Sequence, residues 1–343
     1  MLTATALFAT TAFAHATAFD WENLQSDIHG VAEHTDPNVV NPWGIALSSS
    51  GNVWVNDNGA GVATVYDQDG TAASNSTTPR VVTIPPSATN NDGANPTGIV
   101  ANSTSFFKIT KGINSQPARF IFVSEDGMIS GWNPNVESAN AVVAKDNGAT
   151  GAVYKGATIG VSGGHNFLYV ANFHANKVET YNENFVLQGG FPFTDPTTGP
   201  NAFPSDFAPF DVRNFNGRIY VTYAEQNPPD NHDDLAGPGH GFINVFDTAG
   251  HFIKRLVSRG NLNSPWGMEI VNGALWVGNF GDGHINVYDP NSGSFLGTPR
   301  DVFGTPLAFD GLWGLFLGDG RLFFTAGIVD EAHGIFGVIF SVN

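Results

Sequence analysis

The sequence contains no cysteine, so neither disulfides nor a thiolate nucleophile can contribute to this protein. Only 13% of its 343 residues are charged, about half the usual share of roughly 25%. Basic residues are scarce, with 14 Lys and Arg against 31 Asp and Glu and a formal net charge of −17. Because phosphate backbones and anionic lipids repel such a chain, we expect neither a nucleic acid nor a membrane as its partner.

Long hydrophobic runs are also missing, because no stretch reaches the roughly 18 apolar residues of a membrane helix. The apolar segment 1–19 is shorter, contains Ala-x-Ala cleavage sites and has no basic start, since Arg80 is the first Lys or Arg. We interpret it as a secretory signal peptide, with a native apolar strand as the alternative. Residues 20–343 are then a secreted, extracellular domain. Two N-glycosylation sequons, at Asn75 and Asn102, agree with that destination and predict a glycoprotein.

Glycine and phenylalanine are abundant, at 41 and 28 residues, and they favour strands and turns over helices. A short motif that usually ends in an aromatic residue and glycine recurs along the chain. Its last positions, 47 to 58 residues apart, are Gly44, Gly98, Gly156, Asp211, Gly267 and Gly314. Each copy begins a unit of four short β-branched and aromatic strands, which is the pattern of a propeller blade. The sequence therefore predicts an all-β fold, a six-bladed β-propeller in one domain.

The sixth unit has no fourth strand of its own before the chain ends. Segment 21–27 precedes the first motif as an outer strand would. We predict that this N-terminal strand completes the last blade and closes the ring, which protects sheet edges and replaces disulfides as a constraint. We expect the closed molecule to be a monomer.

Particular segments within this pattern resemble a known family. They read HTDPNVVNPWGI (34–45), EDGMISGWNP (125–134), ANFHA (171–175) and GNFGDG (278–283). They are similar to a family of secreted six-bladed propellers from bacteria, fungi and giant viruses, some with PEP-CTERM sorting tails, which has no assigned activity. The blade pattern is also similar to NHL and SMP-30/gluconolactonase propellers. The resemblance covers residues 20–343 and implies the fold, but no particular reaction.

A ring of polar residues follows the second strand of successive units, on the face where the central channel opens. Those with suitable oxygens are Asp57, Glu125, Asn172 and Asn279, and Tyr223 takes this place in the fourth unit. Carboxylate and amide oxygens suit Ca²⁺ or another divalent metal. The ring resembles the channel metal site of SMP-30 and paraoxonase propellers. The alternative is that these residues only stabilise tight turns.

A second set of candidates supplies acid and base groups. His34, Asp36, His174 and Glu225 fall in loops expected on the same face, and histidine is the usual general acid or base near neutral pH. We predict these four as catalytic residues, with surface or loop packing as the alternative. No closely spaced zinc motif or nucleotide-binding loop is present.

The fourth unit carries a long insertion, residues 224–240, between its second and third strands. It is predicted either to form a flap over the channel mouth or to be a surface excursion. Trp43, Trp266 and Trp313 recur at the start of units, and we expect them to pack inside the fold.

Three functions remain open, and the sequence does not decide whether the protein is an enzyme. The first is a pocket on the channel face that binds a small organic ligand, as in a metal-assisted lactonase, lyase or cyclase. The alternative is a non-catalytic secreted module that binds carbohydrate or protein. A structural envelope protein is a third reading.

Overall fold

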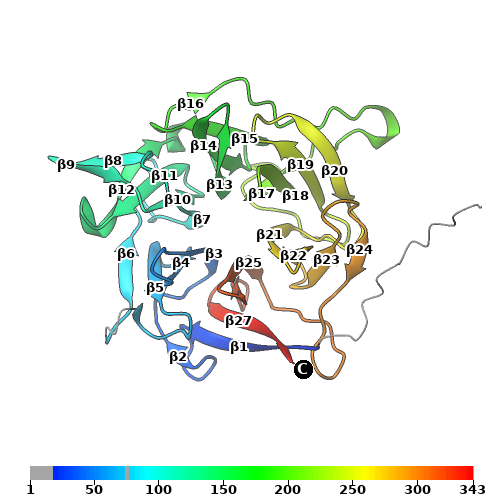
Figure 1. Ribbon diagram of the computed structural model, residues 1–343, viewed down its shortest axis with the longest axis horizontal. Coiled ribbons are helices and arrows are strands. Elements are labelled where there is room, and N and C mark those ends of the chain that lie inside the picture. The colour runs from blue at the N-terminus through cyan, green and yellow to red at the C-terminus, as the bar shows by residue number, and fades with distance from the viewer. Residues whose placement is uncertain (1–17, 74–76, 343) are drawn as a thin grey trace, which may run out of the picture.

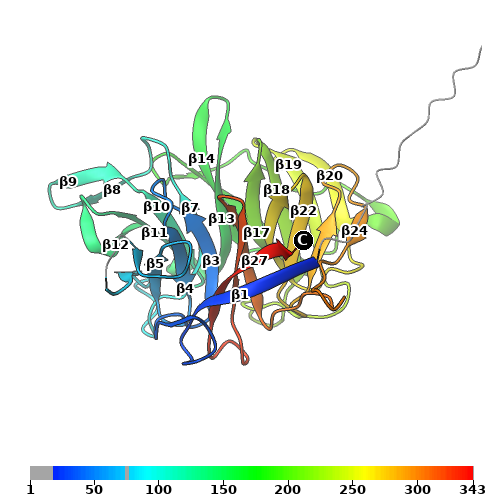
Figure 2. The same cartoon turned by 60° about the horizontal axis from the view of Figure 1, so that its bottom comes forward.

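The computed structural model describes residues 18–73 and 77–342. Antiparallel sheets stand around a central axis (Figure 1), and their strands run through the thickness of the disc (Figure 2). The described part contains the 3₁₀ turns Gly148–Thr150 and Gly199–Asn201. No helix within those residues is long and apolar enough to traverse a bilayer. The expected signal peptide falls mainly outside the described residues, as does Asn75.

Three sheets have four strands each, in sequence order. The first contains β13 (Tyr154–Ser162), β14 (His165–Asn172), β15 (Lys177–Asn182) and β16 (Leu187–Gln188). The second contains β17 (Phe207–Phe215), β18 (Arg218–Glu225), β19 (Phe242–Asp247) and β20 (Phe252–Ser258). The third contains β21 (Pro265–Val271), β22 (Ala274–Asn279), β23 (Ile285–Tyr288) and β24 (Phe295–Gly297).

An eight-stranded sheet consists of two such units joined at their outer edges. One unit contains β3 (Pro42–Leu47), β4 (Val53–Asp57), β5 (Val62–Tyr66) and β6 (Arg80–Thr83). The other contains β7 (Pro96–Ala101), β10 (Phe120–Ser124), β11 (Met128–Asn133) and β12 (Glu137–Asp146), and a separate hairpin is formed by β8 (Lys108–Lys111) and β9 (Asn114–Pro117). A single parallel pair, Asn140 with Thr83, joins the units.

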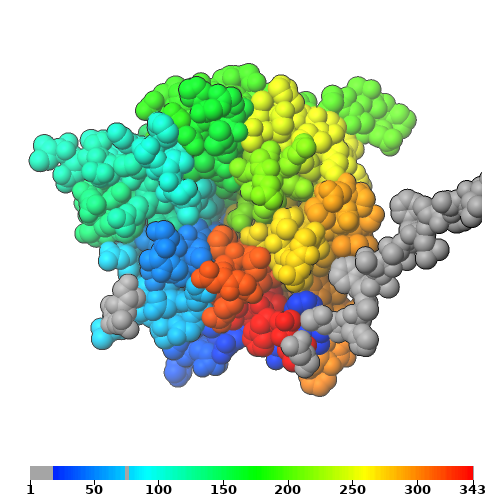
Figure 3. All heavy atoms as spheres, in the orientation of Figure 1, coloured from blue at the N-terminus to red at the C-terminus, as the bar shows by residue number. Residues whose placement is uncertain are grey.

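The last sheet contains strands from both ends of the chain. Its order from the outer edge inwards is β2 (His34–Thr35), β1 (Ala18–Ser26), β27 (Ile335–Val342), β26 (Arg321–Ala326) and β25 (Leu312–Gly318). β1 and β27 pair antiparallel, with Ala18 opposite Val342 and Ser26 opposite Ile335. In the space-filling view the blue N-terminal strand accordingly lies beside the red C-terminal one (Figure 3).

The recurring glycine has a steric role at the axis, where the innermost strands of neighbouring units meet. A Cβ added to Gly44 would lie 2.4 Å from the Thr97 carbonyl oxygen, and one on Gly314 would lie 2.5 Å from the Trp43 oxygen. Since real Cβ atoms do not approach so closely, the motif requires glycine for this backbone packing. The fourth unit differs, because Asp211 occupies this position and is buried.

The three repeated tryptophans are buried, as expected, and meet around the axis. Trp43 stacks on Trp313 with ring centroids 3.4 Å apart, and Trp266 contacts both edge-on at 5.6 and 5.9 Å. Phe173 and Phe210 complete the same apolar cluster. The polar residues of the channel face therefore rest on an aromatic floor.

Candidate functional site

The insertion between β18 and β19 folds over the channel, as the flap hypothesis predicted. The Leu235 N–H donates to the Glu225 carbonyl, and Gln226 forms a bridge with Asp234, which together tie the two arms of the loop. The Gln226 side chain also donates to the carbonyl of Phe173, in the aromatic cluster, at 2.6 Å. The loop is thereby held across the face on which the second strands end.

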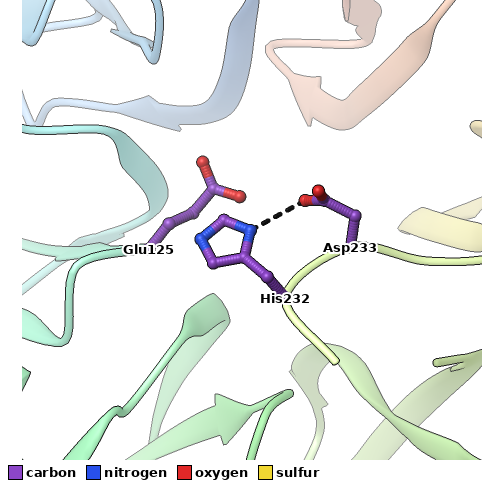
Figure 4. Close-up of side chains that lie close together, drawn as sticks. All are labelled: Glu125, His232 and Asp233. Atoms are coloured by element: carbon purple, nitrogen blue, oxygen red, sulfur yellow. Dashed lines mark hydrogen bonds and ion pairs between the residues drawn. The ribbon is translucent and has the colours of Figure 1, made fainter. Parts of the chain in front are cut away.

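The tip of this loop lies close to Glu125, a residue that follows a strand of a different sheet. Glu125, just after β10, and His232 and Asp233 of the loop each place a donor atom within 4.8 Å of the others. Figure 4 shows the three side chains pointing towards one another near the centre of the ring. His232 Nδ1 lies 2.9 Å from Asp233 Oδ1. We call these three residues the central cluster.

The His232–Asp233 contact changes the titration of both groups. Its hydrogen bond to the Asp233 carboxylate raises the pKa of the His232 imidazole above its usual value. The same bond lowers the pKa of Asp233 to about 2. The side chains remain 44% and 69% exposed, so molecules from solvent can reach them. The pair thus presents an oriented imidazole beside a firmly ionised carboxylate.

A buried lysine lies beneath the central cluster. Lys155 follows Tyr154 in the motif of the third unit, its side chain is 2% exposed, and its Nζ donates to Glu125 Oε1 at 2.5 Å. Nζ also lies 3.6 Å from Asp233 Oδ1 and over the ring of Trp43, 5.1 Å from its centroid. Burial, the largest single effect, lowers the pKa of Lys155, but the charge and hydrogen bond of Glu125 together with the nearby Asp233 and Asp234 raise it above its usual value. The site therefore contains a fixed positive charge.

Further amides and carboxyl groups surround this ion pair. Asn58 donates to Glu125 Oε2 at 2.8 Å, so each carboxylate oxygen of Glu125 has a partner. Asn41 donates to Glu331 at 2.9 Å and accepts the indole N–H of Trp313. Burial raises the pKa of Glu331 above its ordinary value. The carboxylates of Glu125 and Asp233 thus share the ammonium of Lys155.

Two kinds of chemistry fit this arrangement. The half-exposed imidazole of His232, oriented through Nδ1, is able to transfer a proton through Nε2. The three donors of the central cluster are also a candidate set for a divalent metal ion. One nitrogen and two carboxylates match a transition metal such as zinc better than Ca²⁺, which prefers oxygen ligands. The Lys155 ammonium competes with any cation for Glu125.

Of the four predicted metal ligands, the described structure brings Glu125 alone into this cluster. Asp57 accepts a hydrogen bond from Thr64 at 2.8 Å, and burial raises its pKa well above the ordinary value. Asn172 donates to Glu179 on the adjacent strand at 2.9 Å. Asn279 donates to Asp282 and to the carbonyl of Asn261. All four follow or end their strands at the same face, but three are directed into their own units.

The four predicted catalytic residues are also dispersed. His34 lies on β2, at the outer edge of its sheet, and Asp36 is buried with Tyr66 donating to it at 2.9 Å. His174 contacts the carbonyl of Asp230, and Glu225 pairs with His240 at 3.1 Å, so both support the insertion loop.

Sequence reasoning missed Lys155, His232 and Asp233 as site residues. Two signals were available. Lys155 is a charged residue at a motif position that is Trp, Thr or Phe in the other units, and the insertion holds a His-Asp pair at its tip.

Comparisons with known proteins identify relatives in sequence and, more distantly, solved structures with the same fold. No protein-family model matches it. Two uncharacterized proteins of Acanthamoeba polyphaga mimivirus are 32% and 31% identical over 326 residues, which is 92% of this chain and 78% and 83% of theirs.

Solved structures with the same architecture are more distant in sequence. A streptogramin B lyase has a TM-score of 0.55 at 14% identity, covering 96% of this chain and 100% of that one. Virginiamycin B lyase from Staphylococcus aureus has 0.54 at 15%, covering 94% and 100%. A protein of unknown function from Bacteroides thetaiotaomicron has 0.57 at 12%, covering 94% and 76%. At these identities the likeness establishes a β-propeller and no activity.

Proposed function

The chain belongs to the family of these mimivirus proteins, and from its central cluster we propose that it is a six-bladed β-propeller enzyme acting on a small organic molecule. The reaction would be of the lactonase, lyase or cyclase type, in which a proton is moved while negative charge develops on an oxygen. The observation that carries the proposal is the half-exposed His232–Asp233 pair above the buried Glu125–Lys155 ion pair.

Within this proposal the residues have separate roles. His232 takes or gives the proton at Nε2, because Asp233 engages Nδ1 and fixes the orientation of the ring. Lys155 is a positioning residue: its buried ammonium attracts Glu125 and Asp233 and holds them towards the axis. The two named lyases share the fold, and a lyase reaction is one of those we propose.

The blade count and the closure of the ring are part of the same proposal. The eight-stranded sheet is held together by one residue pair, which supports counting it as two blades. Pairing of β1 with β27 and the close approach of Gly314 to Trp43 support closure between the last and first units. Deletion of residues 20–28 should therefore abolish cooperative unfolding. An unchanged melting temperature would contradict closure.

A substrate panel tests the catalytic role directly. Lactones and esters that can undergo elimination are incubated with the protein, and products are followed by mass spectrometry. His232→Ala should reduce turnover by about 10²–10⁴-fold, the usual contribution of a general acid or base. Asp230→Asn, in the same loop, is the matched control and should retain full turnover. Equal turnover in both variants would refute the role of His232, and binding without turnover would favour the non-catalytic module.

A metal-assisted version of the proposed reaction is tested by measuring bound metal. We propose that Glu125, His232 and Asp233 hold the divalent ion, with zinc favoured by the donor types. Elemental analysis should then find about one equivalent of metal, and a chelator should lower the melting temperature of the wild type but not of His232→Ala. If the protein holds less than about 0.2 equivalents of metal and its melting temperature does not respond to a chelator, the metal-assisted mechanism is refuted. Proton transfer by His232 does not depend on that result.

We also propose that the protein acts as an exported monomer. The apolar segment 1–19 and the low charge support export. Expression of the full chain in eukaryotic cells should yield protein in the medium that lacks this segment, as determined by N-terminal sequencing. Retention in the cells with an intact N-terminus would contradict export. Light scattering of the purified protein should give the molecular mass of a monomer.

A further inference from the structure

A second hollow lies away from the central cluster. Its volume is about 430 Å³, and it is bounded by the segment that joins β20 to β21 and by the outer part of the sheet formed by β21–β24. None of the residues that line it belongs to the central cluster. The volume is within the range of small-molecule sites, roughly 300–1,000 Å³.

Three asparagines and a threonine supply neutral hydrogen-bonding groups to the walls of this groove, beside apolar residues. Asn286 donates to the carbonyl of Asn261 at 3.0 Å and accepts from Thr298 at 3.3 Å, so the amide is fixed in orientation. Asp282 accepts from Asn263 at 3.2 Å and is 38% exposed. Preoriented amides and one accessible carboxylate are suited to receive hydroxyl groups.

An aromatic surface adjoins these polar groups. Phe295 is 47% exposed, and its position is fixed by an edge contact with Tyr288, with ring centroids 5.7 Å apart. His284, which is 42% exposed, adds a ring nitrogen 3.4 Å from Asp282 in the same loop. The groove therefore offers an apolar ring and hydrogen-bonding groups to one ligand, which must have both an apolar face and several hydroxyls.

Charge excludes other ligand classes. No Lys or Arg is among the residues that line the groove, and Asp282 repels anions. Phosphorylated, sulfated or carboxylated ligands are therefore disfavoured, and the fixed amides disfavour a purely apolar one. We propose that this groove is a binding site for a neutral saccharide of one or two rings, separate from the catalytic site.

An oligosaccharide array tests the proposal with defined probes. The purified full chain is applied to neutral malto-, cello- and manno-oligosaccharides and to sulfated and sialylated counterparts. We expect binding to neutral glycans, and the affinity of the strongest is then measured by calorimetry with the free disaccharide. Phe295→Ala and Asp282→Asn should each weaken this affinity at least tenfold.

Matched controls separate this site from the rest of the protein. Phe303→Ala removes an aromatic ring that is 88% exposed and outside the groove, and it should leave the affinity unchanged. His232→Ala should also leave it unchanged, so failure of the proposed catalytic function would not affect this result. Thr298→Val is a milder second variant if Phe295→Ala proves unstable. The proposal is overturned if no neutral glycan binds, if charged glycans bind better, or if the groove variants bind like the wild type.

Discussion

The buried carboxyl group of Asp211 leads to a prediction of how stability depends on pH. Asp211 stands where five other units have glycine, at the narrow centre of the channel, and is 3% exposed. Its Oδ1 accepts the N–H of Val212 at 2.7 Å. Burial raises the pKa of this carboxyl from 3.8 to about 6, although the charge of Arg213 acts in the opposite direction. We predict that Asp211→Asn stabilises the protein at neutral pH.

The sign follows from proton binding. Between pH 3.8 and about 6 the folded state binds more protons at Asp211 than the unfolded state does, so stability falls as the pH rises through this window. The difference of roughly two pKa units corresponds to about 3 kcal/mol at pH 7 and to about half of that at pH 5. Asparagine keeps the acceptor for Val212 and is neutral at every pH, so it should remove this penalty.

Denaturant unfolding of both proteins tests the magnitude. The free energy of unfolding is measured in urea at several values between pH 4 and pH 8. The advantage of Asp211→Asn should be near zero at pH 4 and grow to about 3 kcal/mol above pH 7. Asp301→Asn, at a partly exposed loop position, is the control, and its difference from wild type should not follow this curve. A difference in the free energy of unfolding between Asp211→Asn and wild type that does not change with pH would refute the reasoning.

Three further perturbations test the site and the axis. Asp233→Asn should lower the pKa of His232 towards its ordinary value, as followed by NMR titration of the ring protons, and an unchanged pKa would show that Asp233 is not its cause. Glu125→Gln should destabilise the protein by about 3–5 kcal/mol in urea unfolding, because it leaves a buried ammonium without its close partner; a neutral effect would mean that water reaches that ammonium. Gly314→Ala should lower stability by about 1–3 kcal/mol through overpacking, whereas the control Gly189→Ala, which meets no atom within 4 Å, should not; equal effects would dismiss the steric role of the motif glycine.

Much of the architecture was readable from the sequence because it is encoded locally and repeated. Alternating β-branched and aromatic residues form strands wherever they occur, and glycine at Gly44 and its counterparts is required wherever innermost strands touch. Asp57, Asn172 and Asn279 end the second strands of their units, and Glu125 directly follows one. The strand order follows from the pattern because consecutive strands pair antiparallel, so the second strand has the same direction in each unit.

Tertiary structure alone decided which of these side chains form a site. Asp57, Asn172 and Asn279 find hydrogen-bond partners within their own units, and the repeat pattern carries no information about that choice. His232 reaches Glu125 only because the insertion is folded across the channel.

The charge at the axis was likewise set by packing between distant segments. Lys155 occupies a motif position that is aromatic in four of the other five units. Its ammonium is stabilised by Glu125 from the preceding unit and by Asp233 from the following one. Coulombic stabilisation of this kind depends on distance in space and on burial. The sequence by itself thus determined the repeated strands and the strand ends at which polar residues gather, while folding of the ring and of the loop between β18 and β19 selected the groups that meet there.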